Sequence, residues 1–562
     1  MDSYHLDSKQ VKNVDVSDSP GSPPNGADDV FDDGLSHVAE KFRGTSADKR
    51  DMMVMGKKQV LRRNFSFITM LGFASTCIAS WEGILTYDDI LYPSPPFVSS
   101  TLTVLRLFSR YLGFVLTDGG LPLLFWGFIA CAIGQTLVYA SVAEMASMSP
   151  TAGGQYHWVS EFAPQRLRKV LSYYSGWLTA IGWQVYNASV CFLVGTMIQG
   201  LIVLNDPTYI YKRWHGTLLS MSTTVFCISF NTVLASRLPI IEGMVLILHV
   251  LGFFAVVITL WVMAPRADAH TALLDFTNSG GWSSDGLSAM IGLLAPMAVL
   301  VGYDCSVHMS EEIKDASVTL PRAIMGSVLV NITLVFVVVT TLCFTTGDQT
   351  VAASSATGYP FIQVFYGATN SFAGTNVLTA IIIVMMAACA VSEVAAASRQ
   401  IWAFARDGGL PASPWLARIS PGWNIPLPAV SVTLLVSALI SLINIGSTVA
   451  LNAITSLGAI ATLVSYFLTI SCVLYRRITG PELPPRRWSL GRWGLIINVA
   501  ALLFLIPLIF FLSWPLVTPV TATTMNWSST MLGGSLIIAT AYYLVWGKTS
   551  YVPPVVHVKR NM

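Results

Sequence analysis

Twelve long apolar stretches constrain this chain more than any other feature of its sequence. A segment of about 20 apolar residues, rising about 1.5 Å per residue, covers roughly 30 Å of hydrocarbon. The stretches are 64–86, 121–147, 171–200, 216–233, 239–264, 286–308, 324–346, 375–404, 427–445, 449–475, 493–513 and 529–547. We therefore predict an all-α integral membrane protein with twelve transmembrane helices in a lipid bilayer.

The amino-acid composition supports a membrane protein. The chain has 562 residues, of which 53% are hydrophobic and 11% are charged, whereas a soluble protein carries about 25% charged residues. The formal net charge is +2, so the chain lacks the strongly basic surface that a nucleic-acid partner requires. All eight cysteines fall inside the apolar stretches. We expect packed thiols rather than disulfides.

The first and the sixth apolar stretch are each interrupted by an acid close to a glycine. A carboxylate in hydrocarbon costs several kcal/mol, roughly 3 on insertion scales, so it persists where it faces a cavity or a partner. The two interruptions lie five stretches apart, at matching places in two five-helix halves. The residues are Ser80, Trp81, Glu82 and Gly83 in the first stretch, and Gly302, Tyr303 and Asp304 in the sixth. This pattern predicts a secondary transporter whose substrate binds at these residues, near the bilayer midplane.

The placement of lysine and arginine predicts the orientation of the helices. An even number of crossings puts both termini on one side, which we assign to the cytoplasm. Five of the 32 basic residues then lie outside, and the other 27 lie inside. The sequon Asn526-Trp527-Ser528 faces outside and is a candidate for glycosylation at Asn526. We expect the protein in the plasma membrane, with the vacuole or another endomembrane as alternatives.

Residues 1–60 differ in character from the rest of the chain. They are rich in Asp and Ser and poor in apolar runs, so they cannot bury enough surface to offset the entropy of ordering. We predict a disordered cytoplasmic tail, and no cleavable signal peptide. The tail is either a solvated leader or a site for phosphorylation or ubiquitin, with candidates at Lys9, Lys12, Ser17 and Ser19.

Four motifs together carry a family resemblance. They are Trp81-Glu82-Gly83, the run from Gly153 to Val159 (GGQYHWV), His308-Met309-Ser310-Glu311-Glu312 with Pro321-Arg322-Ala323, and the run from Ser398 to Pro411 (SRQIWAFARDGGLP). The chain resembles, over roughly residues 60 to 550, the fungal amino acid, GABA and choline permeases of the amino acid–polyamine–organocation superfamily. The motifs are highly specific in combination.

The resemblance implies a fold and an activity. The implied fold has two inverted five-helix repeats, with discontinuous helices 1 and 6, followed by two peripheral helices. The chain would then divide into the tail 1–60, the ten-helix transport core 61–475, a loop with the two peripheral helices at 476–548, and a short cytoplasmic tail at 549–562. The implied activity is proton-linked uptake of a small amine or amino acid.

Glu82 allows two interpretations. An ionised carboxylate would repel a substrate carboxylate, strongly so in a low dielectric. Glu82 could instead pair with a cationic amine such as choline or a polyamine. Alternatively, Glu82 is protonated by burial and carries the coupled proton. Trp81 and Tyr303 offer aromatic rings for cation–π contact with an ammonium group.

Further charged residues are candidates for coupling and for gating. Proton-coupling candidates are Glu82, Asp304, Glu242, His249 and Glu393. Candidates for a cytoplasmic gate lie at the inner ends of spans six to eight: Glu311, Glu312, Arg322, Arg406 and Asp407. Single surface pairs contribute only about 0–1 kcal/mol, so a network would be needed to hold such a gate.

Other classes of protein fit the sequence less well. The chain has no His-Glu-x-x-His motif and no phosphate-binding Gly-x-x-x-x-Gly-Lys-Ser/Thr loop, which argues against an enzyme, against ATP-driven transport and against a metal or other cofactor. A channel would need a ring of like groups. An exporter of a basic metabolite and a non-transporting nutrient sensor remain alternatives on the same fold. The sequence does not distinguish among choline, GABA, a polyamine and an amino acid as substrate.

Overall fold

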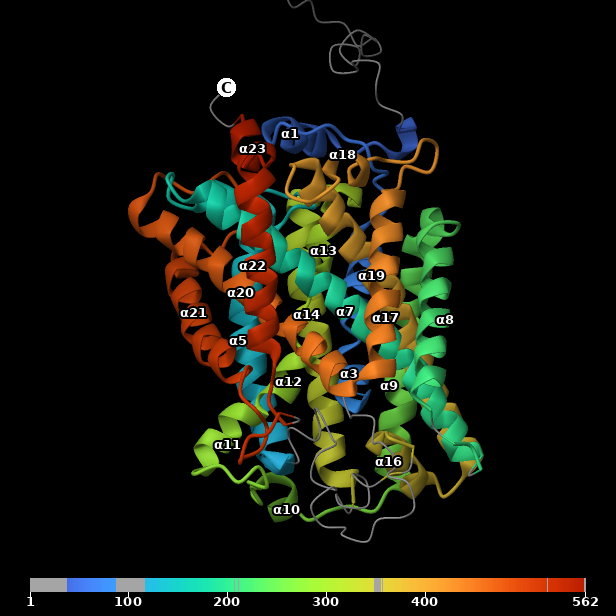
Figure 1. Cartoon of the computed structure of the whole chain (residues 1–562). Helices are drawn as coiled ribbons and strands as arrows, with labels where there is room; N and C mark the ends of the chain where they lie inside the picture. Colours follow the sequence, from blue (N-terminus) through green and yellow to red (C-terminus); the bar gives the residue numbers. More distant parts are fainter. Residues whose placement is uncertain are drawn as a thin grey trace, which may run out of the picture.

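The computed structural model describes residues 38–86, 117–206, 208–210, 212–347, 355, 357–522 and 524–559. These residues are helical, with two isolated β-bridges and no strand among them. The helices stand side by side in a bundle (Figure 1). Residues 1–37, which include the four predicted modification sites, lie outside the described part. So do Arg106 and Arg110, two of the five basic residues predicted to face outside.

Ten helical segments in the described residues are long and apolar enough to cross a membrane. They are α2 with α3 (Phe67–Ile78, Ser80–Thr86), α5 (Gly120–Met148), α7 (Arg168–Asn205), α9 (Leu238–Met263), α14 (Ala316–Thr345), α17 (Phe372–Arg406), α19 (Leu427–Gly446), α20 (Thr448–Thr479), α21 (Gly494–Phe511) and α22 (Ser528–Tyr542). Two predicted spans fall outside this set. One is α8 (Arg213–Asn231), and the other is divided into α11 (Asp285–Gly292), α12 (Leu294–Ala298) and α13 (Cys305–His308).

Helical structure is broken just before the first predicted interruption and at the second, whereas Ser80, Trp81, Glu82 and Gly83 themselves lie within helix α3. Ala79 separates α2 from α3 in the left-handed conformation, with φ of 43°. Residues 299–304 separate α12 from α13, and Gly302 there has φ of 110°. A side chain is strained at such an angle, so glycine suits position 302. All of α3 is buried, which places the first break inside the protein.

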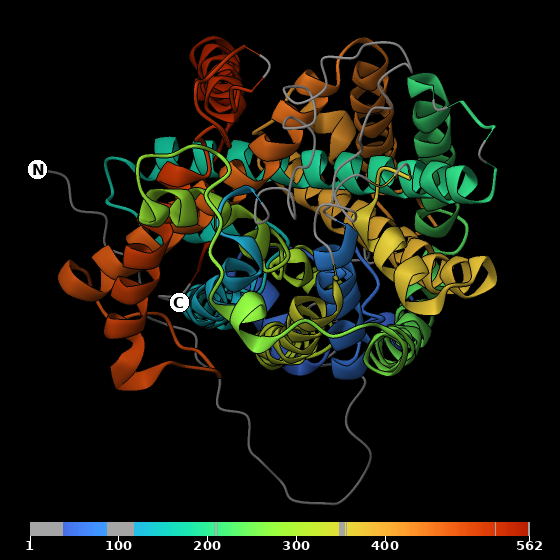
Figure 2. The same ribbon diagram turned by 90° about the horizontal axis from the view of Figure 1, so that it is seen from below.

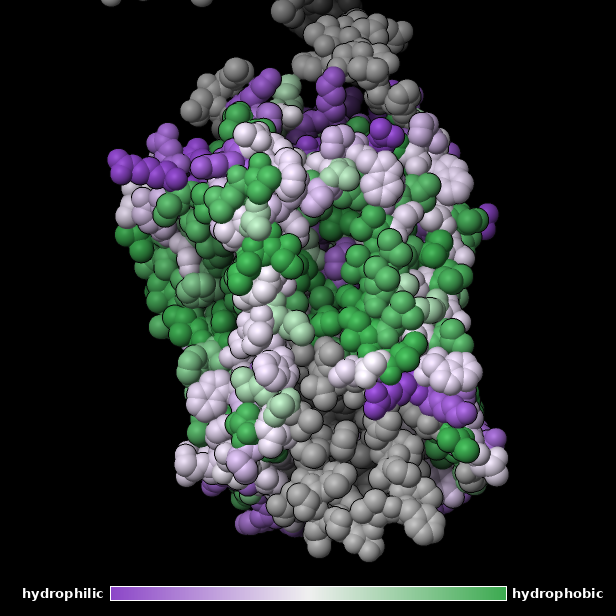
Figure 3. Space-filling view, viewed as in Figure 1, coloured by the Kyte–Doolittle hydropathy of each residue, from purple (hydrophilic) through white to green (hydrophobic). Residues whose placement is uncertain are grey.

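The long helix α7 lies at the centre of the packing. It packs against α8, α17 and α20, while α5 packs against α14 and α21. Figure 2 shows the red α22 at the rim of the bundle, over α7, where the Tyr173 hydroxyl donates to the carbonyl of Ala539 at 3.0 Å. Apolar side chains form a band across the face of the molecule seen in Figure 3. That band matches the hydrocarbon layer that such a bundle requires.

Both ends of the described chain lie at one end of the bundle, which we call the terminal face (Figure 1). Helix α1 (Ser46–Val54) begins there with a capping box formed by Thr45 and Asp48. The C-terminal segment joins it, because the amide of Lys559 donates to the carbonyl of Val54 at 2.7 Å. Hydrophilic side chains gather at this face (Figure 3).

Residues 38–60 therefore differ from the disordered tail predicted for 1–60. Asp48 is buried, accepts from the backbone amides of Asp315 and Ala316 at 2.8 and 2.9 Å, and pairs with buried Arg63 at 3.3 Å. These contacts with residues far along the chain order a segment that has few apolar residues of its own. Composition could not reveal the backbone contacts, because Asp315 and Ala316 lie at the start of α14, more than 260 residues along the chain.

Candidate functional site

The two helix breaks meet inside the bundle. The Ser80 hydroxyl, at the start of α3, lies 3.1 Å from the hydroxyl of Tyr303. Asn331 of α14 fixes this contact by donating to Ser80 Oγ at 3.1 Å and to the carbonyl of Ser75 at 3.0 Å. The amide of Gly302 donates to the Tyr139 hydroxyl at 2.8 Å. Side chains thus replace the helical partners that the break removes, as a hydrocarbon environment demands.

A small cavity lies between the breaks. It has a volume of about 10 Å³, which is room for roughly one water molecule. Ile78 and Ala298, the last residues of α2 and α12, line it together with Gly302 and Val301. Trp183 and Tyr186 of α7 and Glu393 of α17 complete the wall. The sequence pattern indicated the breaks and Glu393, but the two aromatic residues of α7 carried no such signal.

Asp304 has more partners than a free substrate-binding group would have. Its carboxylate accepts from the Tyr466 hydroxyl and from Gln155 Nε2, and from Trp183 Nε1 at 3.4 Å. His308 Nε2 lies 3.6 Å away. Asp304 therefore joins α13 to α6 (Gln155–Phe162), α7 and α20. The sequence showed the acid but not these partners, although Gln155 lies in the GGQYHWV motif.

Glu82 lies in a buried cluster with Trp81 and His249 of α9. Glu82 Oε1 is 2.7 Å from His249 Nδ1, and Trp81 Nε1 is 3.1 Å from the same nitrogen. An indole N–H can only donate. If Nδ1 accepts from Trp81, the proton between His249 and Glu82 belongs to Glu82; if Nδ1 is protonated, Glu82 is the acceptor. The cluster therefore accommodates two proton positions.

Glu242 and Gly72 lie where α9 crosses α2. The Glu242 carboxylate accepts from Thr76 Oγ1 at 2.8 Å and from Ser392 Oγ of α17 at 2.7 Å. A Cβ added at Gly72 would come within 2.9 Å of the carbonyl of Glu242. The glycine thus allows the close approach of two helices, and the acid links three.

Buried ion pairs close the terminal face. Arg406 at the end of α17 makes two hydrogen bonds to Glu311, at 2.9 and 2.7 Å, and stacks over Trp402. Arg399 donates to Glu312 at 2.8 Å. Although burial alone would raise it, the Arg406 guanidinium and then Lys57 lower the pKa of Glu311 to about 2. The pairs tie α17 to the turn that follows α13.

Asp407 joins this network through residues that the sequence interpretation omitted. It accepts from the Tyr156 hydroxyl at 2.7 Å and lies 3.7 Å from Lys57 Nζ. Burial, together with nearby Arg406, lowers the pKa of Lys57. Of the five predicted gate residues, Arg322 is exposed and is not part of these ion pairs. Lys57 and Arg399 take part instead.

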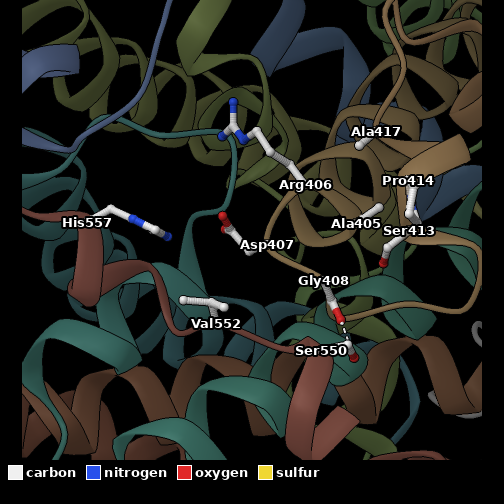
Figure 4. A pocket seen from close by; sticks show the side chains of 10 residues that line it. All are labelled: Ala405, Arg406, Asp407, Gly408, Ser413, Pro414, Ala417, Ser550, Val552 and His557. Carbon is white, nitrogen blue, oxygen red and sulfur yellow. Dashed lines mark hydrogen bonds between the residues drawn. The ribbon is translucent and has the colours of Figure 1, made fainter. Parts of the chain in front are cut away.

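A larger hollow of about 260 Å³ opens beside this network at the terminal face. Figure 4 shows Asp407 and His557 extending into it from opposite sides, while Ser550 Oγ donates to the carbonyl of Gly408 at 3.2 Å. The C-terminal segment forms one wall. This hollow lies at the end of the bundle and away from the helix breaks, so it is distinct from the central cavity.

Asn526 is poorly placed to carry a glycan. Its amide nitrogen donates to the carbonyls of Leu512 and Trp514, at 2.8 and 3.2 Å, and Ser528 of the sequon is buried. The nitrogen that a glycan would occupy is thus used within the folded loop. The eight cysteines are all free and buried, as the sequence predicted.

Comparison with known proteins identifies the class of molecule that this bundle represents. Residues 95–537 match the family model of the amino acid permeases. The chain is 34% identical, over 82% of its length and 97% of the relative's, to a protein described as an amino acid/polyamine transporter of Macrophomina phaseolina. It is 28% identical to the choline transporter of Saccharomyces cerevisiae, over 87% of this chain and 83% of that one.

The chain is also similar to a plant permease. An amino-acid permease of Arabidopsis thaliana is 26% identical, over 90% of this chain and 95% of the relative. The buried breaks and the apolar helices therefore belong to a membrane transporter and not to an enzyme. The chain is a member of the amino acid permease family, within the amino acid–polyamine–organocation superfamily.

Proposed function

We propose that this protein is a secondary active transporter that moves a small amine or amino acid by alternating access, coupled to protons. The observation that carries the proposal is the contact between the two helix breaks beside a central cavity. Broken helices that meet inside a bundle are typical of transporter substrate sites. The relatives described as amino acid, polyamine and choline transporters support this range of substrates.

The proposed fold has twelve crossings, in two inverted five-helix repeats with α21 and α22 outside them. The breaks support it, because they occur in the first and the sixth of the predicted spans. Ten of these crossings are the segments that are long and apolar enough to span a membrane. In this arrangement the other two are α8 and the divided segment α11–α13. Repeats of this kind would rock against each other around the site.

Proton coupling is the part of the proposal that rests on Glu82. Its carboxylate already contacts His249, and Glu82 Oε2 and His249 Nε2 have no hydrogen-bond partner in the described part of the chain. A buried acid that shares a proton with a histidine is suited to load and release that proton as the site opens to each side. This geometry favours a proton carrier over a substrate counter-ion at Glu82.

The proposal is tested by uptake into proteoliposomes. We expect labelled choline, putrescine, GABA or alanine to accumulate against its gradient when the outside is acidified. An uncoupler should abolish the accumulation, and replacement of sodium should leave it unchanged. One pH unit supplies about 1.4 kcal/mol, which sustains about tenfold accumulation for one proton per substrate. Uptake that follows a sodium gradient at fixed pH would refute proton coupling.

We also propose that the terminal face is cytoplasmic and that the protein resides in the plasma membrane. Basic residues lie at that face, including Arg406, which bonds to Glu311, and Lys548 at the start of α23. Their placement accords with the positive-inside rule. The loop between α21 and α22 would then be extracellular, because it joins the opposite ends of these helices.

A cysteine at exposed Ala522 tests this orientation. We expect Ala522→Cys to react with a membrane-impermeant maleimide in intact cells. The matched control, Thr549→Cys on the terminal face, should react only after permeabilisation. Because the native cysteines are buried, the background should be low. Reaction of Ala522→Cys solely after permeabilisation would reverse the proposed orientation.

A further inference from the structure

Glu393 differs from the other buried acids near the helix breaks. Its side chain is 5% exposed and lines the central cavity. Its Oε2 has no hydrogen-bond partner, and no basic side chain pairs with it, among the described residues. A carboxylate held in this way away from water requires either a proton or a cation.

The other acids near the helix breaks each have a side-chain partner for at least one carboxylate oxygen. Glu82 contacts His249, Asp304 accepts from Tyr466 and Gln155, and Glu242 accepts from two hydroxyls. The nearest arginine on the same helix, Arg399, is bound to Glu312. Glu82 also has one oxygen, Oε2, without a partner among the described residues, but its other oxygen contacts a histidine. Of these acids only Glu393 lines the central cavity.

The rest of the cavity wall carries no charge that could neutralise Glu393. Its other lining residues are Ile78, Trp183, Tyr186, Ala298, Val301 and Gly302. Titratable groups that interact with Glu393 include the thiols of Cys191, Cys389 and Cys305, and none of them is cationic.

Aromatic rings supply the remaining contacts. Trp183 and Tyr186 are adjacent on one face of α7, with ring centroids 6.3 Å apart, and both line the cavity. An ammonium group held by a carboxylate and stacked on such rings gains cation–π attraction. A substrate carboxylate in this cavity would meet the Glu393 carboxylate, which repels it.

We infer that the cavity binds an organic cation, with Glu393 as the counter-ion of its ammonium group and Trp183 and Tyr186 as its aromatic wall. This inference rests on the proposed transport function and narrows its substrate class to amines without a carboxylate. The cavity as it stands holds roughly one water molecule. The substrate enters only when the two helix breaks and α7 move apart, as alternating access requires.

The test compares binding and transport on purified protein in lipid nanodiscs and proteoliposomes. The binding probes are labelled choline and putrescine as cations, and labelled GABA and alanine as zwitterions. We expect wild-type protein to bind at least one cation and neither zwitterion. Glu393→Gln keeps the shape but removes the charge, and should weaken cation binding about 30-fold or more. Thr379→Val, an isosteric change at a buried site on the same helix, should bind as the wild type does.

A measurement on wild-type protein guards against a folding defect in the variant. An apolar carbodiimide should modify Glu393, as read by peptide mass spectrometry, and the bound cation should slow that reaction while alanine does not. If sodium chloride alone protects Glu393 from the carbodiimide, the cavity binds an inorganic cation and the inference is wrong.

The outcomes separate this inference from the proposed function. If wild-type protein transports GABA or alanine but neither cation, the inference fails and the transporter remains. The same holds if Glu393→Gln binds the cation with wild-type affinity. If wild-type protein transports none of the four compounds, the proposed function itself fails, and the inference with it.

Discussion

Glu82→Gln is expected to abolish accumulation of substrate against its gradient while leaving binding and counterflow intact. Glutamine keeps the contact with His249 Nδ1 that Glu82 makes at 2.7 Å, but it cannot carry a proton. The accumulation ratio at a gradient of one pH unit should therefore fall from about tenfold to one. Equilibrium binding and labelled-substrate exchange should be measured on the same proteoliposomes.

The control for this prediction is Glu482→Gln, a change at an exposed acid in the loop before α21. It should accumulate substrate as the wild type does. If Glu82→Gln instead weakens binding of a cation, by roughly 30- to 800-fold, Glu82 is a counter-ion. Wild-type values in every assay would remove Glu82 from the mechanism and direct attention to Glu242.

Glu311→Gln should destabilise the closed terminal face by up to about 3–5 kcal/mol, because it leaves the Arg406 side chain, which is only 21% exposed, without its charged partner. Arg406 makes both of its hydrogen bonds to Glu311 through the two carboxylate oxygens. The expected result is a lower midpoint of thermal unfolding in detergent, and faster reaction of thiols placed near the gate. Glu482→Gln again serves as the control, with a change within about 0.5 kcal/mol.

The stability that the Glu311–Arg406 ion pair contributes should depend on pH. The pKa of Glu311 is lowered to about 2, from its ordinary value of 4.5, chiefly because the Arg406 guanidinium overcomes the effect of burial. The ion pair therefore contributes its full stability above about pH 4.5 and loses it as the pH falls toward 2. Glu311→Gln should show a flatter acid limb than the wild type. An identical acid limb in both proteins would contradict the assignment.

The sequence predicted the helix breaks but not the residue that makes the first of them. Glu82 and Gly83 suggested the position, whereas the left-handed residue is Ala79. Nothing in an alanine indicates a positive φ, because the side chain disfavours it. The conformation is held by tertiary contacts, such as those of Asn331 with Ser75 and Ser80, which sequence periodicity does not reveal.

The sequence also indicated which charged residues are functional candidates, but not which partners they contact. Glu311 and Arg406 stood out as gate candidates, and the structure joins them. Asp304 stood out as a substrate ligand, yet it accepts from Tyr466 and Gln155. Partners more than 140 positions apart depend on how helices cross, and an apolar helix can cross its neighbours in several registers. Chemistry identifies such residues, but the fold decides their contacts.

The eight buried thiols have a practical consequence for measuring motion. None is at the surface, so paired nitroxide spin labels on introduced cysteines can report distances by electron paramagnetic resonance in the otherwise native protein. One label near α18 (Ser413–Leu416) and one near α1 would both lie at the terminal face. The distribution of that single distance, recorded with and without substrate, would resolve the populations of closed and open molecules directly.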